Sequence, residues 1–193
     1  MNILITGVGG QGTILASKIL AGEAIARGEM VRTAETIGMA QRGGSVVSHV
    51  RIGENCQSPA VPKGQADLIL GFEPAEAARN LAYLAPNGHI VASSNGIIPV
   101  TASIGAAPYA VAEVCAYLEN TGRCTLIDGE ALCQEAGSPK VLNVILLAVA
   151  AAKGYLPLTQ EQLNAVIAAQ VKPQFLELNK RAVAVGFAQV KEN

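Results

Sequence analysis

The chain has little charge and few aromatic side chains, and it contains no tryptophan. Charged residues make up 15% of the sequence, whereas hydrophobic residues make up 50%. Because so few charges cannot coat an ordinary monomer, we expect partner proteins to cover part of an apolar surface. The formal net charge is -1, and no basic run interleaved with aromatic residues occurs. This pattern argues against a nucleic-acid-binding protein.

The sequence also lacks the spacing of a metal centre. No C-x-x-C pair occurs, and the cysteine spacing matches neither a zinc site nor an iron–sulfur cluster. The four cysteines are Cys56, Cys115, Cys124 and Cys133. We expect four reduced thiols, some of them in the core, and no metal bound by this chain.

Long apolar runs are missing as well. The longest, Val144 to Ala152, is shorter than the roughly 20 residues that cross a bilayer. The N-terminus enters a strand pattern directly, without a basic segment or a cleavage site. We therefore expect a cytoplasmic protein with no membrane partner.

A glycine-rich turn is the most informative feature that the sequence does contain. The run Gly7-Val8-Gly9-Gly10-Gln11-Gly12 joins an apolar strand, Met1–Thr6, to an amphipathic helix. In a G-x-G-x-x-G turn the glycines permit a tight bend, a close phosphate approach and close helix–strand packing. Backbone N–H groups at the start of the helix favour an anion such as a pyrophosphate. The predicted contacts are Gly7, Gly9, Gly10, Gln11, Gly12 and Thr13.

The rest of the chain alternates between predicted strands and helices, which indicates an α/β fold. We predict strands at Met1–Thr6, Glu29–Glu35, Ser45–Ile52, Asp67–Phe72, His89–Ser93 and Cys124–Asp128. We predict helices from Thr13 to Gly28, Glu73 to about Leu84, Pro108 to Asn120, Ser138 to about Lys153, Thr159 to Lys172 and Gln174 to about Lys191. The expectation is one three-layer domain over residues 1–193, with a mainly parallel, Rossmann-like sheet and C-terminal helices.

A second glycine-interrupted segment, residues 35–44, follows the second predicted strand. We interpret it as a loop at the carboxyl end of the sheet, where ligands bind in such folds. Glu35 and Arg42 are its charged groups best placed to meet a ligand or partner. Glu35 lies 23 residues after Gly12, near the position of the acid that binds ribose in dinucleotide-binding domains. Ser94 and Asn95, after another predicted strand, are secondary candidates for ligand contacts.

No catalytic constellation can be built from the sequence. His49 and His89 are the only histidines, and each lies inside a strand pattern. We place the face that carries His49 and Arg51 at a sheet edge or in an interface. No nucleophile–base pair, paired carboxylates or H-E-x-x-H motif occurs. The sequence therefore indicates a binding subunit without a catalytic residue of its own.

The two glycine segments together, Gly7–Gly12 and Glu35–Val46, followed by Ser48-His49-Val50-Arg51, resemble the gamma subunit or domain of the 2-oxoacid:ferredoxin oxidoreductases. The resemblance covers essentially the whole chain, including the late segment Asn179 to Phe187. The form Gly-Met-Ala-Gln-Arg-Gly-Gly looks more like the indolepyruvate and 2-oxoglutarate branches than the pyruvate branch. In the indolepyruvate members this unit is a separate small beta subunit.

This resemblance implies a subunit of a complex that decarboxylates a 2-oxoacid oxidatively, forms an acyl-CoA and reduces ferredoxin. It places thiamine diphosphate, magnesium and the iron–sulfur clusters on partner subunits. This chain would complete the active site and help to hold CoA at the glycine turn. The implied active-site loop comprises Glu35, Gly38, Gln41, Arg42, Gly43 and Gly44.

Two alternatives stay open at this point. One is a free-standing NAD- or FAD-binding Rossmann oxidoreductase, which the glycine turn and Glu35 would serve. The other is a scaffold whose glycine turn binds nothing.

Overall fold

A computed structural model describes residues 1–37, 43–54, 56–98 and 109–190. Six strands form one sheet in the order β2-β3-β1-β4-β5-β6. The strands are β1 (Asn2–Val8), β2 (Val31–Ile37), β3 (Ser45–Ile52), β4 (Ala66–Gly71), β5 (Leu84–Ser93) and β6 (Cys124–Ile127). The helices are α1 (Thr13–Ala26), α2 (Pro74–Arg79), α4 (Val111–Glu119), α5 (Gly129–Ala136), α6 (Leu142–Ala152), α7 (Gln160–Gln170) and α8 (Leu176–Ala188).

The sheet is parallel from β1 to β6 and antiparallel around β3. Strand β1 pairs in parallel with β4, β4 with β5, and β5 with β6. Strand β3 lies between β1 and β2 and is antiparallel to both. The carboxyl ends of β1, β2, β4, β5 and β6 therefore lie along one edge of the sheet. The mainly parallel α/β prediction is confirmed.

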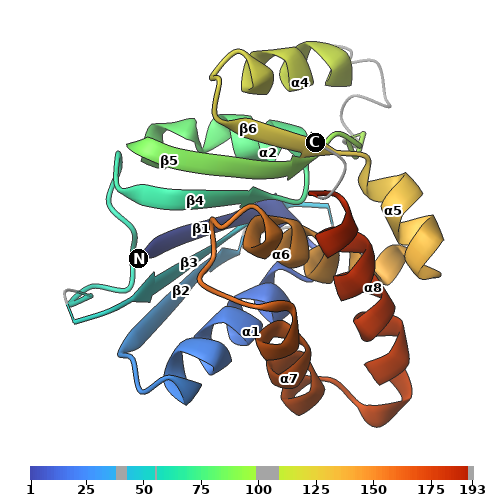
Figure 1. The fold of residues 1–193 in the computed structure, drawn as a ribbon. Coiled ribbons are helices and arrows are strands. Elements are labelled where there is room, and N and C mark those ends of the chain that lie inside the picture. Colours follow the sequence, from blue (N-terminus) through green and yellow to red (C-terminus); the bar gives the residue numbers. More distant parts are fainter. Residues whose placement is uncertain (38–42, 55, 99–108, 191–193) are drawn as a thin grey trace.

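Helices cover both faces of the sheet, which makes the three layers (Figure 1). Helices α1, α6, α7 and α8 lie on one face, and α2 and α4 lie on the other. Alternation along β1 sends Ile3 and Ile5 into the first core and Leu4 into the second. The same alternation on β4 sends Leu68 and Ile69 to opposite cores.

Helix α6 is the centre of the larger core. All of its residues from Asn143 to Ala151 are buried. Helix α8 approaches it closely at Gly186, where an added Cβ would lie 2.5 Å from Ala148 Cβ and 2.9 Å from the Ile145 carbonyl oxygen. Within the described residues, no single helix is long and apolar enough to cross a membrane, whereas the bent pair Gly129–Ala136 and Pro139–Ala152 meets that criterion by length and composition.

Several predicted boundaries were wrong, among them that of β2, which covers Val31–Ile37 instead of Glu29–Glu35. Helix α2 ends at Arg79 instead of near Leu84, because the side-chain amide of Asn80 donates to the Glu76 carbonyl (2.8 Å) and closes the helix. A 3-10 turn, Leu81–Tyr83, then leads into β5. Ser138 caps a 3-10 turn, Pro139–Val141, and α6 begins only after it.

Helix α5 was missing from the predictions. Its N-cap is Asp128, whose side chain accepts from the Ala131 N–H (3.1 Å), and it ends at Gly137 with a φ of 97°. The predicted strand ended one residue too late, since Asp128 caps the helix instead of extending β6.

Of the two predicted places for the face with His49 and Arg51, the sheet edge was wrong, and the interface stays a prediction. Strand β3 is an interior strand, and His49 is only 7% exposed. Its Nδ1 accepts a hydrogen bond from the Val61 N–H (3.1 Å), so the segment between β3 and β4 covers it. The ring of Tyr83 contacts His49 edge-on, with centroids 5.9 Å apart.

Candidate functional site

The glycine turn connects β1 to α1 in the way that the motif predicts. An added Cβ on Gly7 would lie 2.7 Å from Gln11 Oε1 and 3.0 Å from Phe72 Cβ, so close packing requires glycine there. Gly10 and Gly12 have positive φ angles of 104° and 85°, which L side chains rarely adopt. Space beside Gly10 is open, with no heavy atom within 4 Å of an added Cβ.

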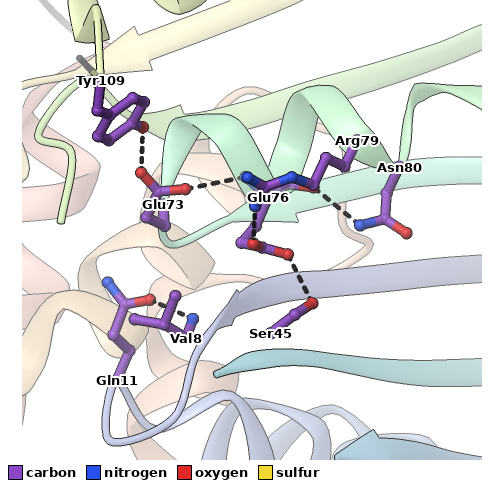
Figure 2. A network of polar contacts seen from close by, with 8 residues as sticks. All are labelled: Val8, Gln11, Ser45, Glu73, Glu76, Arg79, Asn80 and Tyr109. Carbon is purple, nitrogen blue, oxygen red and sulfur yellow. Dashed lines mark hydrogen bonds and ion pairs between the residues drawn. The ribbon is translucent and has the colours of Figure 1, made fainter. Parts of the chain in front are cut away.

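Gln11 braces this turn. Its Oε1 accepts from the Val8 N–H (2.8 Å), as Figure 2 shows, and its Nε2 donates to the Phe72 carbonyl (2.9 Å). One amide group thereby joins the end of β1, the start of α1 and the residue after β4. The predicted ligand contact of Gln11 remains a prediction, and both ends of its side-chain amide hold the protein.

No side chain of α1 neutralises the positive end of its helix dipole. Gly12 is the N-cap and offers no capping side chain, and the first turn contains no acidic residue. The first intrahelical bond joins the Ala16 N–H to the Gly12 carbonyl (3.1 Å). The N–H groups of residues 13–15 therefore precede the intrahelical ladder and can donate to an anion. Thr13 itself is only 4% exposed and packs its methyl group toward Gly7.

A pocket of about 950 Å³ opens in front of this helix end. Gly10, Gln11, Gly12 and Leu15 form its first wall. Its floor follows the ends of β4 and β5 and consists of Phe72, Ser93, Asn95, Gly96 and Ile97. Of the predicted contacts, Gly10, Gln11, Gly12 and Asn95 line the pocket, and Thr13 lies directly behind them at the helix start.

The far wall comes from α5, the turn after it and α6, which sequence reasoning did not identify. Glu130, Cys133, Gln134, Ser138, Lys140 and Leu142 belong to this wall. Lys140 is its cation and Glu130 its carboxylate. Asn143 joins this wall to the start of α1, since its Nδ2 donates to the Gly12 carbonyl (3.4 Å). The same Nδ2 would lie 2.8 Å from an added Cβ on Gly12.

The polar residues after β5 divide into two roles. Asn95 Oδ1 accepts from the Glu130 N–H (2.9 Å), and its Nδ2 donates to Asp128 Oδ1 (3.2 Å). The Ala131 N–H, and then the Asn95 amide, lower the pKa of the Asp128 carboxyl. Ser94 donates to the Ile127 carbonyl (3.1 Å) and holds β6 instead of lining the pocket. Its neighbour Ser93, the last residue of the predicted strand, does line the pocket.

The two glycine segments meet at Gly9. The Gly9 N–H donates to the Gly44 carbonyl (2.9 Å), and the Gly43 N–H donates to the Gly9 carbonyl (3.4 Å). These bonds extend the β1–β3 ladder toward the predicted active-site loop. Gly38, Gln41 and Arg42 of that loop lie outside the described residues.

Glu35 does not lie where a ribose-binding acid is expected. Strand β2 is the edge strand, and β3 separates it from β1. Glu35 is exposed on β2 and pairs with Ser48, which in turn pairs with Ile5 of β1. In a dinucleotide-binding domain the acid follows a strand that neighbours the glycine turn directly.

Two buried carboxylates, Glu73 and Glu76, lie at the start of α2 (Figure 2). Glu73 is 2% exposed, caps α2 by accepting from the Glu76 N–H (2.9 Å), and accepts from the Tyr109 hydroxyl. Glu76 is 3% exposed, pairs with Arg79 and accepts from Ser45 Oγ (2.6 Å). Among the described residues, no group of three or more His, Cys, Asp or Glu side chains could hold a metal ion.

Comparison with known proteins decides the family. Residues 2–189 match the family model for pyruvate ferredoxin/flavodoxin oxidoreductase. The chain belongs to this family. It is 40% identical to the indolepyruvate oxidoreductase subunit IorB of Thermococcus kodakarensis, over 99% of this chain and 96% of the relative. It is 38% identical to the IorB subunit of Pyrococcus horikoshii, over the same shares of the two chains.

Solved structures agree on the fold. The keto/oxoacid ferredoxin oxidoreductase gamma subunit of Geobacter sulfurreducens has a TM-score of 0.70 at 23% identity and covers 100% of this chain and 99% of that one. The 2-oxoglutarate:ferredoxin oxidoreductase of Magnetococcus marinus, solved with coenzyme A bound, has a TM-score of 0.73 at 18% identity; all of this chain matches 31% of it. The resemblance predicted from the glycine segments is confirmed, and the free-standing NAD or FAD enzyme finds no support.

Proposed function

We propose that the chain is the small, gamma-type subunit of an indolepyruvate:ferredoxin oxidoreductase. Support comes from four IorB relatives that are 34% to 40% identical over at least 98% of the chain. In such a complex, thiamine diphosphate with magnesium and the iron–sulfur clusters of partner subunits supply the decarboxylation and electron-transfer chemistry. This chain binds CoA and completes the active site, and ferredoxin receives the electrons from the partner subunits. The complex works in the cytoplasm.

We further propose that the pocket holds the diphosphate of coenzyme A. The uncapped start of α1, opening into a pocket of about 950 Å³, carries this proposal. A diphosphate needs N–H donors and positive charge; residues 13–15 provide the donors, and the α1 dipole and Lys140 provide the charge. Leu15, Ile97 and Leu142 offer apolar wall to the uncharged parts of the same ligand.

The predicted active-site loop keeps its proposed role at the partner interface. Glu35 is exposed, and Gly43 and Gly44 are tied to the glycine turn through Gly9. The charge of Arg42, a proposed member of this loop, suits an anionic group of the ligand or the 2-oxoacid.

A matched pair of glycine substitutions tests the pocket. Gly10 and Gly28 both have positive φ angles, of 104° and 77°, and both have open space where a Cβ would lie. Alanine at either position costs roughly 1–3 kcal/mol of backbone strain. Only Gly10 lines the pocket, whereas Gly28 follows the other end of α1. In the assembled complex, we expect G10A to weaken CoA binding about tenfold or more, because the added methyl group enters the space beside the turn and moves the phosphate away from its N–H donors. We expect G28A to leave CoA binding unchanged.

Calorimetric titration of CoA into the three complexes measures this difference. Equal CoA affinity in wild type, G10A and G28A would show that the turn is a packing device, and the scaffold alternative would replace the proposal. Equal losses in both variants would assign the effect to stability alone and would contradict a phosphate site at Gly10.

A further inference from the structure

The pocket floor at Gly96 depends on side chains that lie outside the pocket. An added Cβ on Gly96 would lie 2.8 Å from Tyr109 Cε1 and 2.6 Å from Val111 Cγ2. Gly96 and Ile97 line the pocket, whereas Tyr109 and Val111 do not. The ring of Tyr109 therefore supports the back of the floor and limits how far this segment can move away from the ligand space.

A buried carboxylate fixes that ring. The Tyr109 hydroxyl donates to Glu73 Oε1, and the other oxygen of Glu73 accepts from the Glu76 N–H (2.9 Å), as Figure 2 shows. Burial, and then the bond to Glu73, raise the pKa of Tyr109, so its hydroxyl keeps the proton that it donates. Glu73 directly follows Phe72, another floor residue that Gln11 holds through its carbonyl.

We propose that Tyr109 and Glu73 are positioning residues that set the shape of the pocket floor at Gly96 and Ile97. The bond joins the start of α2 to the residue that leads into α4. It reaches the pocket floor through Gly96, against which Tyr109 packs, and through Phe72, which precedes Glu73. Because the same floor faces the proposed CoA, the consequence for the enzyme rests on the proposed function: loss of the bond weakens CoA binding and spares the 2-oxoacid.

The first experiment separates two Michaelis constants in the assembled complex. We expect Tyr109→Phe to raise KM for CoA by up to about tenfold, because only part of the free energy of this internal hydrogen bond is transmitted to the ligand through the floor. We expect KM for the 2-oxoacid to stay unchanged. Tyr117→Phe is the matched control, since Tyr117 lies on α4 and is 59% exposed. It should leave both constants at wild-type values.

A second variant keeps the test informative if Tyr109→Phe folds poorly. In Glu73→Gln the amide oxygen can cap α2 while the NH₂ group donates to the Tyr109 hydroxyl oxygen, which reverses the bond without losing it. We expect KM for CoA within about twofold of wild type, since the hydrogen bond is kept. The double variant Glu73→Gln with Tyr109→Phe has no such hydrogen bond, so its KM for CoA should rise as in Tyr109→Phe.

A ligand-free readout distinguishes failure of this inference from failure of the CoA proposal. The Cys115 thiol on α4 donates to the Ser94 carbonyl (3.6 Å), beside the floor segment. If Tyr109 holds α4 against the floor segment, Tyr109→Phe speeds the alkylation of Cys115 in the full chain, and Tyr117→Phe does not. Mass spectrometry measures the alkylation rate. Faster alkylation with an unchanged KM for CoA supports the positioning role and overturns the CoA site. Wild-type alkylation and a wild-type KM for CoA together overturn the positioning role.

Discussion

Gln11 shows how a residue in a binding motif can act on the protein before it acts on any ligand. Its amide joins the Val8 N–H to the Phe72 carbonyl and so fixes the turn between β1 and α1. The sequence predicts Gln11 as a ligand contact but cannot show where its amide points, because Phe72 is 61 positions away along the chain. Asn143 likewise binds the protein at the turn, through the Gly12 carbonyl, and no local sequence pattern predicted this contact.

Burial of His49 makes the stability of the chain depend on pH. Burial lowers the pKa of His49, and its neutral Nδ1 accepts from the Val61 N–H. Below the unfolded value of about 6.5, the unfolded chain therefore binds more protons at this residue than the folded chain. The stability that neutral His49 contributes is fully present above pH 6.5 and decreases as the pH falls from about 6.5 towards the lower pKa of the folded state.

We expect urea denaturation at pH 7.5 and at pH 5.5 to show a smaller loss of stability in His49→Gln than in wild type. His89→Gln removes the other histidine and is the control. Between pH 7.5 and pH 5.5 it should lose as much stability as wild type. An identical pH dependence in wild type and His49→Gln would contradict the assignment to His49.

At the scale of elements, the apolar runs of β1, β3 and β4 were predictable because each core face repeats every second residue. Parallel or antiparallel pairing is not a local property, so the interior place of β3 did not follow from its pattern. The chain length between strands did carry a signal: seven residues, 38–44, separate β2 from β3, too few for the crossover of about a dozen that a parallel neighbour needs. Helix α5 had signals too, in Asp128 and Gly137.

Helix packing yields a prediction from two helix-interior glycines. An added Cβ on Gly186 would meet Ala148 Cβ at 2.5 Å and the Ile145 carbonyl at 2.9 Å, and neither can yield without moving α6. An added Cβ on Gly22 would meet the end of the flexible Gln170 side chain at 2.8 Å. We expect Gly186→Ala to destabilise by roughly 1–3 kcal/mol, and Gly22→Ala to be neutral or to stabilise by up to about 1 kcal/mol.

Urea midpoints at a constant m-value measure both effects. A Gly186→Ala protein as stable as wild type would show that α6 and α8 can separate freely. A large loss in Gly22→Ala would show that the Gln170 side chain cannot move aside at the contact of α1 with α7.

At the scale of the whole molecule, we expect the isolated chain to have no oxidoreductase activity. The described residues bring together a pocket, helix dipoles and one cation at its wall, which can bind and position but not decarboxylate. Assays of the purified chain with indolepyruvate, 2-oxoglutarate and pyruvate, before and after addition of its thiamine-containing partner, measure this. Turnover by the isolated, cofactor-free chain would refute the assignment as a binding subunit.

The place of Asn143 has a consequence for the order of events during synthesis. It lies 131 positions after Gly12, whose carbonyl its amide meets, and the wall formed by α5 and α6 leaves the ribosome long after β1 and α1. A nascent chain that ends before α5 has the glycine turn but lacks the far wall of the pocket. A ligand that needs both walls therefore stabilises only chains that extend into α6, and it cannot guide the folding of β1 and α1 before that point.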